Sequence, residues 1–453
     1  MGNNGGNAWN ERNWISPAVE ILRGNSIIGR WRCLDRSPLP TDGVPPKDLH
    51  CWIDPDPKAD NMEVPIRIIS SREIIKPSSR TPNHLRIHKF SRIDQINLDN
   101  AFPFIFFYNS GADKNSSHHL KQSLSKILTH YYPFAGRVKD HFSVECDDYG
   151  VSFIEAHMAT NISEALQDPN PLLLEQLMPY KPHELITTTQ FNLAVQVSYF
   201  GCGGVAICVC FRHCIADAAT AANFIKSWSA VASCGGINTD AIEKDVVLDF
   251  SSIFPPEDWS GLSTNNNFEE LLKSSSTDTA LKRFIFDGSK IAALREIIGN
   301  RPTRFEAVFS LMWKAVTSAR TEGDHFVASF PVNLRRKMNP PVSDQCMGNI
   351  FAALMANWPL EETINYKDFV AKLRELSSLL NDDYVKKAFP NGWTLRHMRN
   401  DAGRDDTKSS RRRIFHISNL HPEFLPLCLG QEIEEDNKQV THSSEVFWDL
   451  IRN

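Results

Sequence analysis

The segment around His213 constrains the fold of this chain more than any other part of the sequence. Val205–Cys210 is an apolar run rich in β-branched and sulfur-containing side chains, which predicts a buried strand. Asp217–Trp228 has helical composition with apolar residues at helical spacing, which predicts a helix. Between them lies the sequence Phe211-Arg212-His213-Cys214-Ile215-Ala216. A strand therefore ends beside a histidine, and an aspartate four residues later begins a helix.

Two interpretations of His213 follow from these residues. A neutral imidazole can take a proton from an alcohol near neutral pH without a metal, which is the signature of a general base. Alternatively, His213 is a half-buried residue at the end of a strand, and Asp217 caps the next helix. The His-x-x-x-Asp spacing alone favours this structural interpretation, so a catalytic assignment needs support from elsewhere in the chain.

The residues before this strand predict a hairpin. Phe191–Phe200 alternates with a period of two and is followed by the turn sequence Gly201-Cys202-Gly203-Gly204. The pattern Gly201-x-Gly203-x-x-Ala206 imitates a dinucleotide-binding fingerprint, but it leads into a strand and not into a helix. We therefore exclude a nucleotide-binding loop, because no helix N-terminus is placed to bind a pyrophosphate. Further helices are predicted over residues 121–129, 291–298, 305–317 and 366–380.

Several ordered motifs carry a resemblance to a known family. They are Glu73-Ile74-Ile75-Lys76-Pro77-Ser78-Ser79, His119–Leu128, Tyr131–Arg137, the His213 segment, Val332–Pro341 and Met347-Gly348-Asn349-Ile350. In this order and at these separations they resemble the BAHD family of plant acyl-CoA-dependent acyltransferases, in its vinorine synthase-like branch. The resemblance extends from Met62 to Ile417.

The resemblance implies an α/β fold of two similar mixed-sheet domains, like that of chloramphenicol acetyltransferase, with an active-site channel between them. It implies that acyl-CoA, with acetyl-CoA as the expected donor, and a small-molecule alcohol enter from opposite faces. Acyl-CoA is then a co-substrate, and no permanently bound cofactor is expected. His213 would be the general base at mid-channel. The acyl group would pass directly to a hydroxyl of a plant specialised metabolite, such as an alkaloid or an alcohol, without an acyl-enzyme.

Two features of the sequence fit direct transfer. The chain has no Gly-x-Ser-x-Gly nucleophile elbow, and Cys214 is expected to point away from the base beside it. The resemblance implies that Asp217 turns away from the site and pairs with Arg335, which would hold the loop that carries His213. Candidates for contact with CoA are Gly348, Asn349, Arg336 and Lys337. A structural turn explains the first two nearly as well, and a solvated surface is the more economical explanation of the two cations.

The two ends of the chain depart from the family pattern. Residues 1–61 show no clear period, which predicts a poorly ordered N-terminal extension outside the family. Residues 62–250 are expected to form the N-terminal acyltransferase domain, 251–280 a crossover loop and 281–453 the C-terminal domain. The Asp-Phe-Gly-Trp-Gly motif expected after Asn419 is absent, which predicts that the C-terminal domain is truncated.

Composition excludes several classes of protein. The 453 residues, 42% of them hydrophobic, are enough for two hydrophobic cores. The net charge of -5 comes with mixed signs and without a basic aromatic stripe, so no nucleic-acid partner is expected. The ten cysteines lack the spacing of a metal or redox site, so we expect reduced core residues and no metal. We expect a cytoplasmic monomer without membrane contact, because neither a span of ~20 apolar residues nor a signal peptide is evident.

Three functional hypotheses stay open at this point. The first is an active acyl-CoA-dependent O-acyltransferase. The second is a truncated, non-catalytic relative that acts as a binding protein. The third is a chloramphenicol-acetyltransferase-like or condensation enzyme, which shares His-x-x-x-Asp, although the Asn333–Pro341 segment favours the BAHD family. The acceptor, the acyl-chain length and the choice between O- and N-acylation depend on channel side chains that the sequence does not locate.

Overall fold

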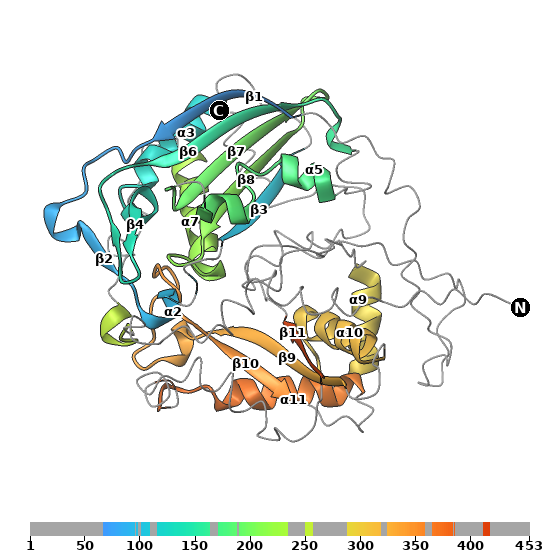
Figure 1. Cartoon of the computed structure of the whole chain (residues 1–453). Coiled ribbons are helices and arrows are strands. Elements are labelled where there is room, and N and C mark those ends of the chain that lie inside the picture. Colours follow the sequence, from blue (N-terminus) through green and yellow to red (C-terminus); the bar gives the residue numbers. More distant parts are fainter. Residues whose placement is uncertain are drawn as a thin grey trace, which may run out of the picture.

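The computed structural model consists of two halves, each built on a β-sheet (Figure 1). It describes residues 67–95, 97, 101–108, 116–163, 171–187, 190–233, 250–256, 288–318, 324–357, 365–383, 385 and 411–416. This architecture confirms the predicted α/β fold class. The predicted extension 1–61, residues 257–280 of the predicted crossover loop and the residues after 416 lie outside the described part, so the predicted domain boundaries stay predictions.

The N-terminal half (67–233) contains a five-stranded sheet with the order β1-β6-β7-β8-β3. These strands are β1 (Arg67–Ile75), β6 (Val151–Met158), β7 (Leu193–Phe200), β8 (Val205–Arg212) and β3 (Ala101–Tyr108). Strands β6 and β7 pair in parallel, and the other neighbours pair antiparallel. The predicted hairpin is confirmed as β7 and β8. Gly203 in its turn has a φ of 85°, a conformation that glycine adopts without steric cost.

The central strands of this sheet are buried on both faces. On one face, Ile207, Val209 and Phe211 of β8 join the main core with residues of α3 (Ser116–Ile127) and α7 (Ala218–Ser233). On the other face, Cys208 and Cys210 pack with residues 178 and 185, the latter on α6 (Pro182–Thr187). A strand covered on both faces is continuously apolar, which explains the Val205–Cys210 run. These two cysteines are free and buried, whereas Cys202 in the turn is exposed.

The N-terminal half also contains a small sheet with the order β2-β5-β4. Its strands are β2 (Ile87–Lys89), β4 (Arg137–Asp140) and β5 (Ser143–Glu145). The short helices next to them in the chain are η2 (Asn83–Leu85), α2 (Arg92–Gln95) and η3 (Tyr132–Ala135). Helix α5 (Pro171–Gln176) contributes Leu173 to a separate cluster with Phe200 of β7.

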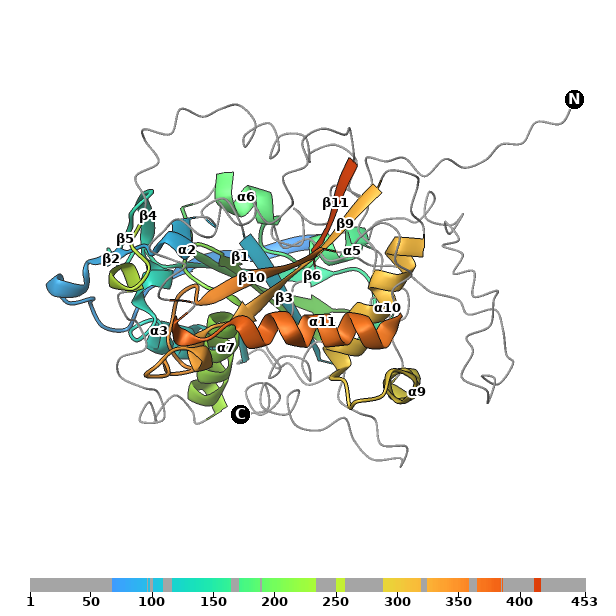
Figure 2. The ribbon, with the colours of Figure 1, turned by 90° about the horizontal axis from the view of Figure 1, so that it is seen from below.

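The C-terminal half (288–416) contains a three-stranded sheet with the order β10-β9-β11. Its strands are β9 (Asp324–Asn333), β10 (Phe351–Asn357) and β11 (Arg411–His416), and its α-helices are α9 (Gly288–Ile298), α10 (Arg304–Ser318) and α11 (Tyr366–Leu379). Strand β9 pairs antiparallel with β10 and parallel with β11. Helices α10 and α11 pack together, and α11 contacts β10 (Figure 2). The helices predicted over 121–129, 291–298, 305–317 and 366–380 are confirmed within five residues of their ends.

The short helical turn η4 (Phe250–Ser252) lies in the segment that joins the two halves. A second one, η5 (Arg335–Lys337), lies in the segment between β9 and β10. Each half inserts a side chain into the core of the other. Met347 of the C-terminal half is fully buried in the main core of the N-terminal half. Ile93 of α2 is fully buried in the core of the C-terminal half, together with Phe250 and Phe254. The two halves are therefore interlocked by packing, so each contributes to the stability of the other.

Substituting Met347 should destabilise the N-terminal half although the residue belongs to the C-terminal one. Met347→Ala leaves a cavity in the main core and should lower the free energy of unfolding by about 2–5 kcal/mol. Met347→Leu nearly conserves the volume and should cost less than about 1.5 kcal/mol. The measurement is denaturant unfolding followed by tryptophan fluorescence. Equal stability of the alanine variant and the original chain would contradict the interlocked packing.

Candidate active site

His213 lies in the turn between β8 and α7, and aromatic rings from both halves flank it. The ring of Phe102 on β3 meets it edge-on, with centroids 4.9 Å apart. The ring of Phe351, the first residue of β10, lies 6.1 Å away. His213, Phe102 and Phe351 are all half-buried. The imidazole thus lies where the two halves meet, in largely apolar surroundings.

The Tyr131–Arg137 motif helps to hold the turn that carries His213. The side-chain Nδ2 of Asn192 donates to the carbonyls of Pro133 and Gly136, at 3.0 and 2.9 Å. The carbonyl of Asn192 in turn accepts from the backbone N–H of Arg212, at 2.9 Å. A Cβ at Gly136 would lie 2.6 Å from the carbonyl oxygen of Glu145, so this close approach requires glycine. The motif therefore positions the end of β8.

A chain of hydrogen bonds leads from the imidazole to a buried carboxylate. His213 Nδ1 lies 3.0 Å from Asn349 Oδ1. Asn349 Nδ2 donates to the His213 carbonyl at 2.6 Å and to Asp94 Oδ1 at 2.8 Å. The other oxygen of Asp94 accepts from the backbone N–H and the hydroxyl of Ser91, at 2.8 and 2.7 Å. The predicted residues His213 and Asn349 are thus in direct contact.

The surroundings of this chain shift two pKa values in opposite directions. Burial lowers the pKa of His213 below its ordinary value of 6.5, although a hydrogen bond with its own backbone, the charge of Asp217 and the hydrogen bond of Asn349 act in the other direction. The imidazole is therefore neutral at pH 7. Burial raises the pKa of Asp94 from 3.8 to about 6, against hydrogen bonds from Ser91 and Asn349 that lower it. Asp94 is consequently ionised at pH 7 but titrates just below it.

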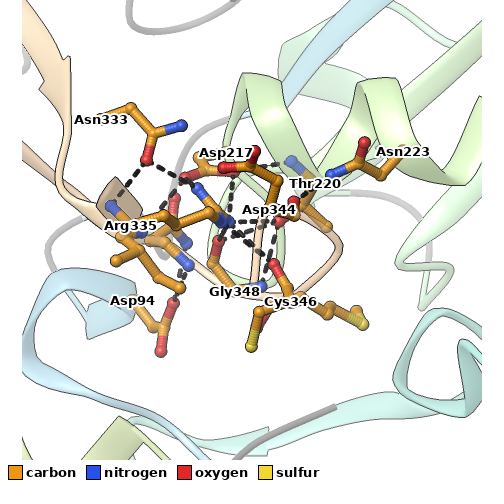
Figure 3. A network of polar contacts seen from close by, with 12 residues as sticks. Asp94, Asp217, Thr220, Asn223, Asn333, Arg335, Asp344, Cys346 and Gly348 are labelled. Atoms are coloured by element: carbon orange, nitrogen blue, oxygen red, sulfur yellow. Dashed lines mark hydrogen bonds and ion pairs between the residues drawn. The ribbon is translucent and has the colours of Figure 1, made fainter. Parts of the chain in front are cut away.

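Asp217 has a different set of partners (Figure 3). It accepts from two nitrogens of Arg335, at 2.7 and 3.1 Å, so the ion pair is bidentate. It also accepts from the backbone N–H of Thr220 at 2.8 Å, which caps the first turn of α7, and from that of Ile350 at 3.1 Å. Burial alone would raise the pKa of Asp217, but the charge and hydrogen bonds of Arg335 hold it below its usual value. Both sequence interpretations of Asp217, helix cap and partner of Arg335, describe real contacts.

The guanidinium of Arg335 also organises the segment before β10, and it is fully buried. It donates to the Cys346 carbonyl at 2.9 and 3.2 Å and to the Gly348 carbonyl at 3.1 Å. The hydroxyl of Thr220 donates to the Gly348 carbonyl at 2.9 Å. Gly348 has a φ of 126°, a backbone conformation that L side chains rarely adopt. These bonds place Asn349, the next residue, beside His213.

The cations next to Arg335 have other partners. Arg336 is exposed and forms an ion pair with Asp344. Lys337 Nζ donates to the carbonyl of Ser377 on α11, at 3.1 Å. Neither contact leads to His213, so the structure does not join these two candidates to the histidine site. Their predicted contact with CoA phosphates stays a prediction.

Asp94 is the site residue that the sequence analysis missed. A local signal exists, because Ser91-x-x-Asp94 is a capping-box pattern, and Asp94 N–H does donate to Ser91 Oγ at 3.3 Å. That pattern predicts the start of a short helix. It gives no indication of the contact with Asn349, which lies 255 residues further along the chain.

Cys214, beside His213, is fully buried. No group of three or more His, Cys, Asp or Glu side chains in the described ranges is arranged to hold a metal ion. Within the same ranges, no helix is long and apolar enough to cross a membrane.

Adjacent arginines should respond very differently to the same substitution. Arg335→Met leaves the buried carboxylate of Asp217 uncompensated and should lower the free energy of unfolding by about 3–5 kcal/mol. Arg336→Met removes an exposed ion pair and should cost at most about 1 kcal/mol. Urea unfolding of both variants at pH 7 and moderate salt measures the difference. Comparable losses in the two variants would contradict a structural role for the buried pair.

Comparison with known proteins places this chain in a family. The model of the Transferase family matches residues 65–400. Epi-neemfruitin B synthase L1AT of Melia azedarach is 45% identical over 349 residues, which are 74% of this chain and 79% of the relative. Limonoid 1-O-acetyltransferase of Citrus sinensis is 45% identical over 349 residues, which are 72% and 78%.

A solved structure supports the same placement. The crystal structure of vinorine synthase aligns with a TM-score of 0.63 and 32% identity, over 81% of this chain and 86% of that one. The Rauvolfia serpentina enzyme is 37% identical over 338 residues, which are 69% of this chain and 76% of the relative. These matches, together with the extent of the family model, show that the chain belongs to the BAHD family of acyl-CoA-dependent acyltransferases.

Proposed function

We propose that this protein transfers an acetyl group from acetyl-CoA to a hydroxyl of an apolar plant metabolite, with His213 as the general base. The observation that carries the proposal is the placement of the His213 imidazole between the two halves, against the rings of Phe102 and Phe351. Nδ1 of the ring lies 3.0 Å from Asn349 Oδ1. Nε2 is then the nitrogen that takes the proton of the acceptor hydroxyl.

The reaction is proposed as a direct transfer. Nε2 of His213 takes the proton of the acceptor hydroxyl while the hydroxyl oxygen forms a bond to the thioester carbonyl carbon. The carbonyl oxygen becomes an oxyanion in the tetrahedral intermediate. Its collapse breaks the C–S bond, and the imidazolium returns the proton to the departing thiolate, which gives the ester and CoA. No acyl-enzyme and no permanently bound cofactor enter this scheme.

The names of relatives support the choice of donor and acceptor. One of the two relatives at 45% identity is named a limonoid 1-O-acetyltransferase. The aromatic side chains of Phe102 and Phe351 beside His213 favour an acceptor with an apolar skeleton. We therefore propose a limonoid-type alcohol as the first acceptor to test. The expected monomeric state and cytoplasmic location stay predictions.

Removing the imidazole should abolish acetyl transfer. His213→Ala should lower kcat by about 10²–10⁴-fold, the usual contribution of general-base catalysis. His157→Ala is the matched control, since His157 is an exposed residue of β6, and its activity should be unchanged. The assay follows free CoA thiol and identifies the acetyl ester by mass spectrometry.

Acetyl-CoA binding separates loss of chemistry from loss of fold. Saturation at 100 times Kd adds about 2.7 kcal/mol to the stability of a folded binder, so both variants should show a higher Tm with acetyl-CoA. CoA release that survives His213→Ala would disprove the role of His213. Binding without turnover in the original chain, with every limonoid alcohol tested, would instead favour the alternative of a non-catalytic relative.

Activity should depend on pH through His213 and Asp94. His213 accepts a proton only when neutral, and burial holds its pKa below 6.5. Asp94 has a pKa of about 6, so both groups gain a proton as the pH falls through this region. We expect kcat/KM to be level between about pH 7 and 8 and to fall below about pH 6. A falling limb centred above pH 7, in a profile measured at constant ionic strength, would contradict this assignment.

A further inference from the structure

We propose that Asp94 and Asn349 are positioning residues that fix His213 in the tautomer with its proton on Nδ1, so that Nε2 is free to accept a proton. The inference rests on the proposed role of His213. It adds that two residues from opposite halves of the molecule determine which ring nitrogen of His213 carries the proton.

The side-chain amide of Asn349 has one favourable orientation. Its nitrogen faces two groups that can only accept at neutral pH, the carbonyl of His213 at 2.6 Å and Asp94 Oδ1 at 2.8 Å. Turning the amide over would place its oxygen against both of these oxygens. Because an amide nitrogen donates and an amide oxygen accepts, the observed orientation is the favourable one. The amide oxygen is therefore directed at the imidazole.

The orientation of the amide determines which nitrogen of the ring carries the proton. Asn349 Oδ1 lies 3.0 Å from His213 Nδ1 and can only accept, so Nδ1 must carry a hydrogen. A neutral imidazole has one N–H, which leaves a lone pair on Nε2. The edge-on contact with Phe102 restrains the ring plane at the same time.

Asp94 is the group that orients the amide of Asn349. This carboxylate is buried and receives four donors, the N–H and hydroxyl of Ser91 and the N–H and Nδ2 of Asn349. Four donors and no acceptor suit the ionised form. Burial raises the pKa of Asp94 to about 6, so the carboxylate is still ionised at pH 7.

Asp217, the motif carboxylate, is not available for this task. Both of its oxygens are occupied by Arg335 and by the N–H groups of Thr220 and Ile350. In Ser-His-Asp triads the carboxylate binds Nδ1–H directly, and an amide in its place costs about 10⁴-fold in kcat through the wrong tautomer. Here a neutral amide stands between carboxylate and ring. It orients the imidazole without bringing a full negative charge against it.

The first measurement is made on the unsubstituted protein. Nitrogen-15 labelling of histidine reports which ring nitrogen carries the proton, and the His213 signals are assigned by their absence from His213→Gln. We expect a neutral ring with hydrogen on Nδ1 at pH 7.5. Hydrogen on Nε2 would overturn the inference whatever the variants do. This measurement does not require turnover, so its outcome is independent of the proposed function. Failure of the proposed function would appear instead as acetyl transfer by His213→Ala.

The second measurement uses Asp94→Asn. An amide at position 94 must present its NH₂ either to the Ser91 N–H or to the Asn349 donors. Reversal of Asn349 relieves the conflict with its side chain and brings Nδ2 to the ring, although it gives up the hydrogen bond to the His213 carbonyl. We expect the proton to move to Nε2 and kcat to fall about 10²–10⁴-fold, with the KM for acetyl-CoA changed by less than about threefold.

Asp148→Asn is the matched control. Asp148 is also a hydrogen-bonded carboxylate of the N-terminal half, held by Thr81 and Arg86, and its φ of 59° suits asparagine equally well. It should change neither kcat nor the tautomer. An Asp94→Asn variant that loses activity with hydrogen still on Nδ1 would show a merely structural role and overturn the inference. Full activity with an unchanged tautomer would overturn it as well. If Asp94→Asn fails to fold, the tautomer of the unsubstituted protein decides.

Discussion

The buried ion pair between Arg335 and Asp217 is the contact on which the rest of the site depends. It joins the segment before β10 to the first turn of α7, so it joins the two halves at the place where His213 lies. Its geometry is bidentate, and both groups have further hydrogen bonds. A buried pair gains little net stability over apolar packing, because desolvation offsets the attraction. Its main effect is therefore to specify one way of docking the two halves.

The same docking gives two buried carboxylates opposite properties. Asp217 lies against a guanidinium, which keeps its pKa low, so it stays charged over the whole physiological range. Asp94 lies against neutral donors, and burial raises its pKa to about 6. Environment and not residue type thus separates a permanent structural charge from a titrating one. Burial also disfavours the cation of His213, which lowers the pKa of its imidazole.

The sequence was sufficient for those features that depend on neighbours in the chain. The hairpin and the helix after Asp217 were predictable from their periodic patterns. The buried strand was predictable from its continuous apolar run, because both faces of β8 are covered. Arg335 was found through the family resemblance, which carries information about distant contacts that periodicity lacks. Asp94 was missed because its local pattern indicates only a helix start. Its partner is set by how the two halves dock, which no spacing rule encodes.

The separation of these partners along the chain has a consequence for biosynthesis. His213 and Asn349 are 136 residues apart, and Asp94 and Asn349 are 255 apart. Contacts this distant form late, and N-terminal segments leave the ribosome first. A nascent N-terminal half therefore carries the histidine and both carboxylates before Arg335 and Asn349 exist to bind them. The ordered imidazole is a property that the chain acquires near the end of folding, when the second half closes on the first.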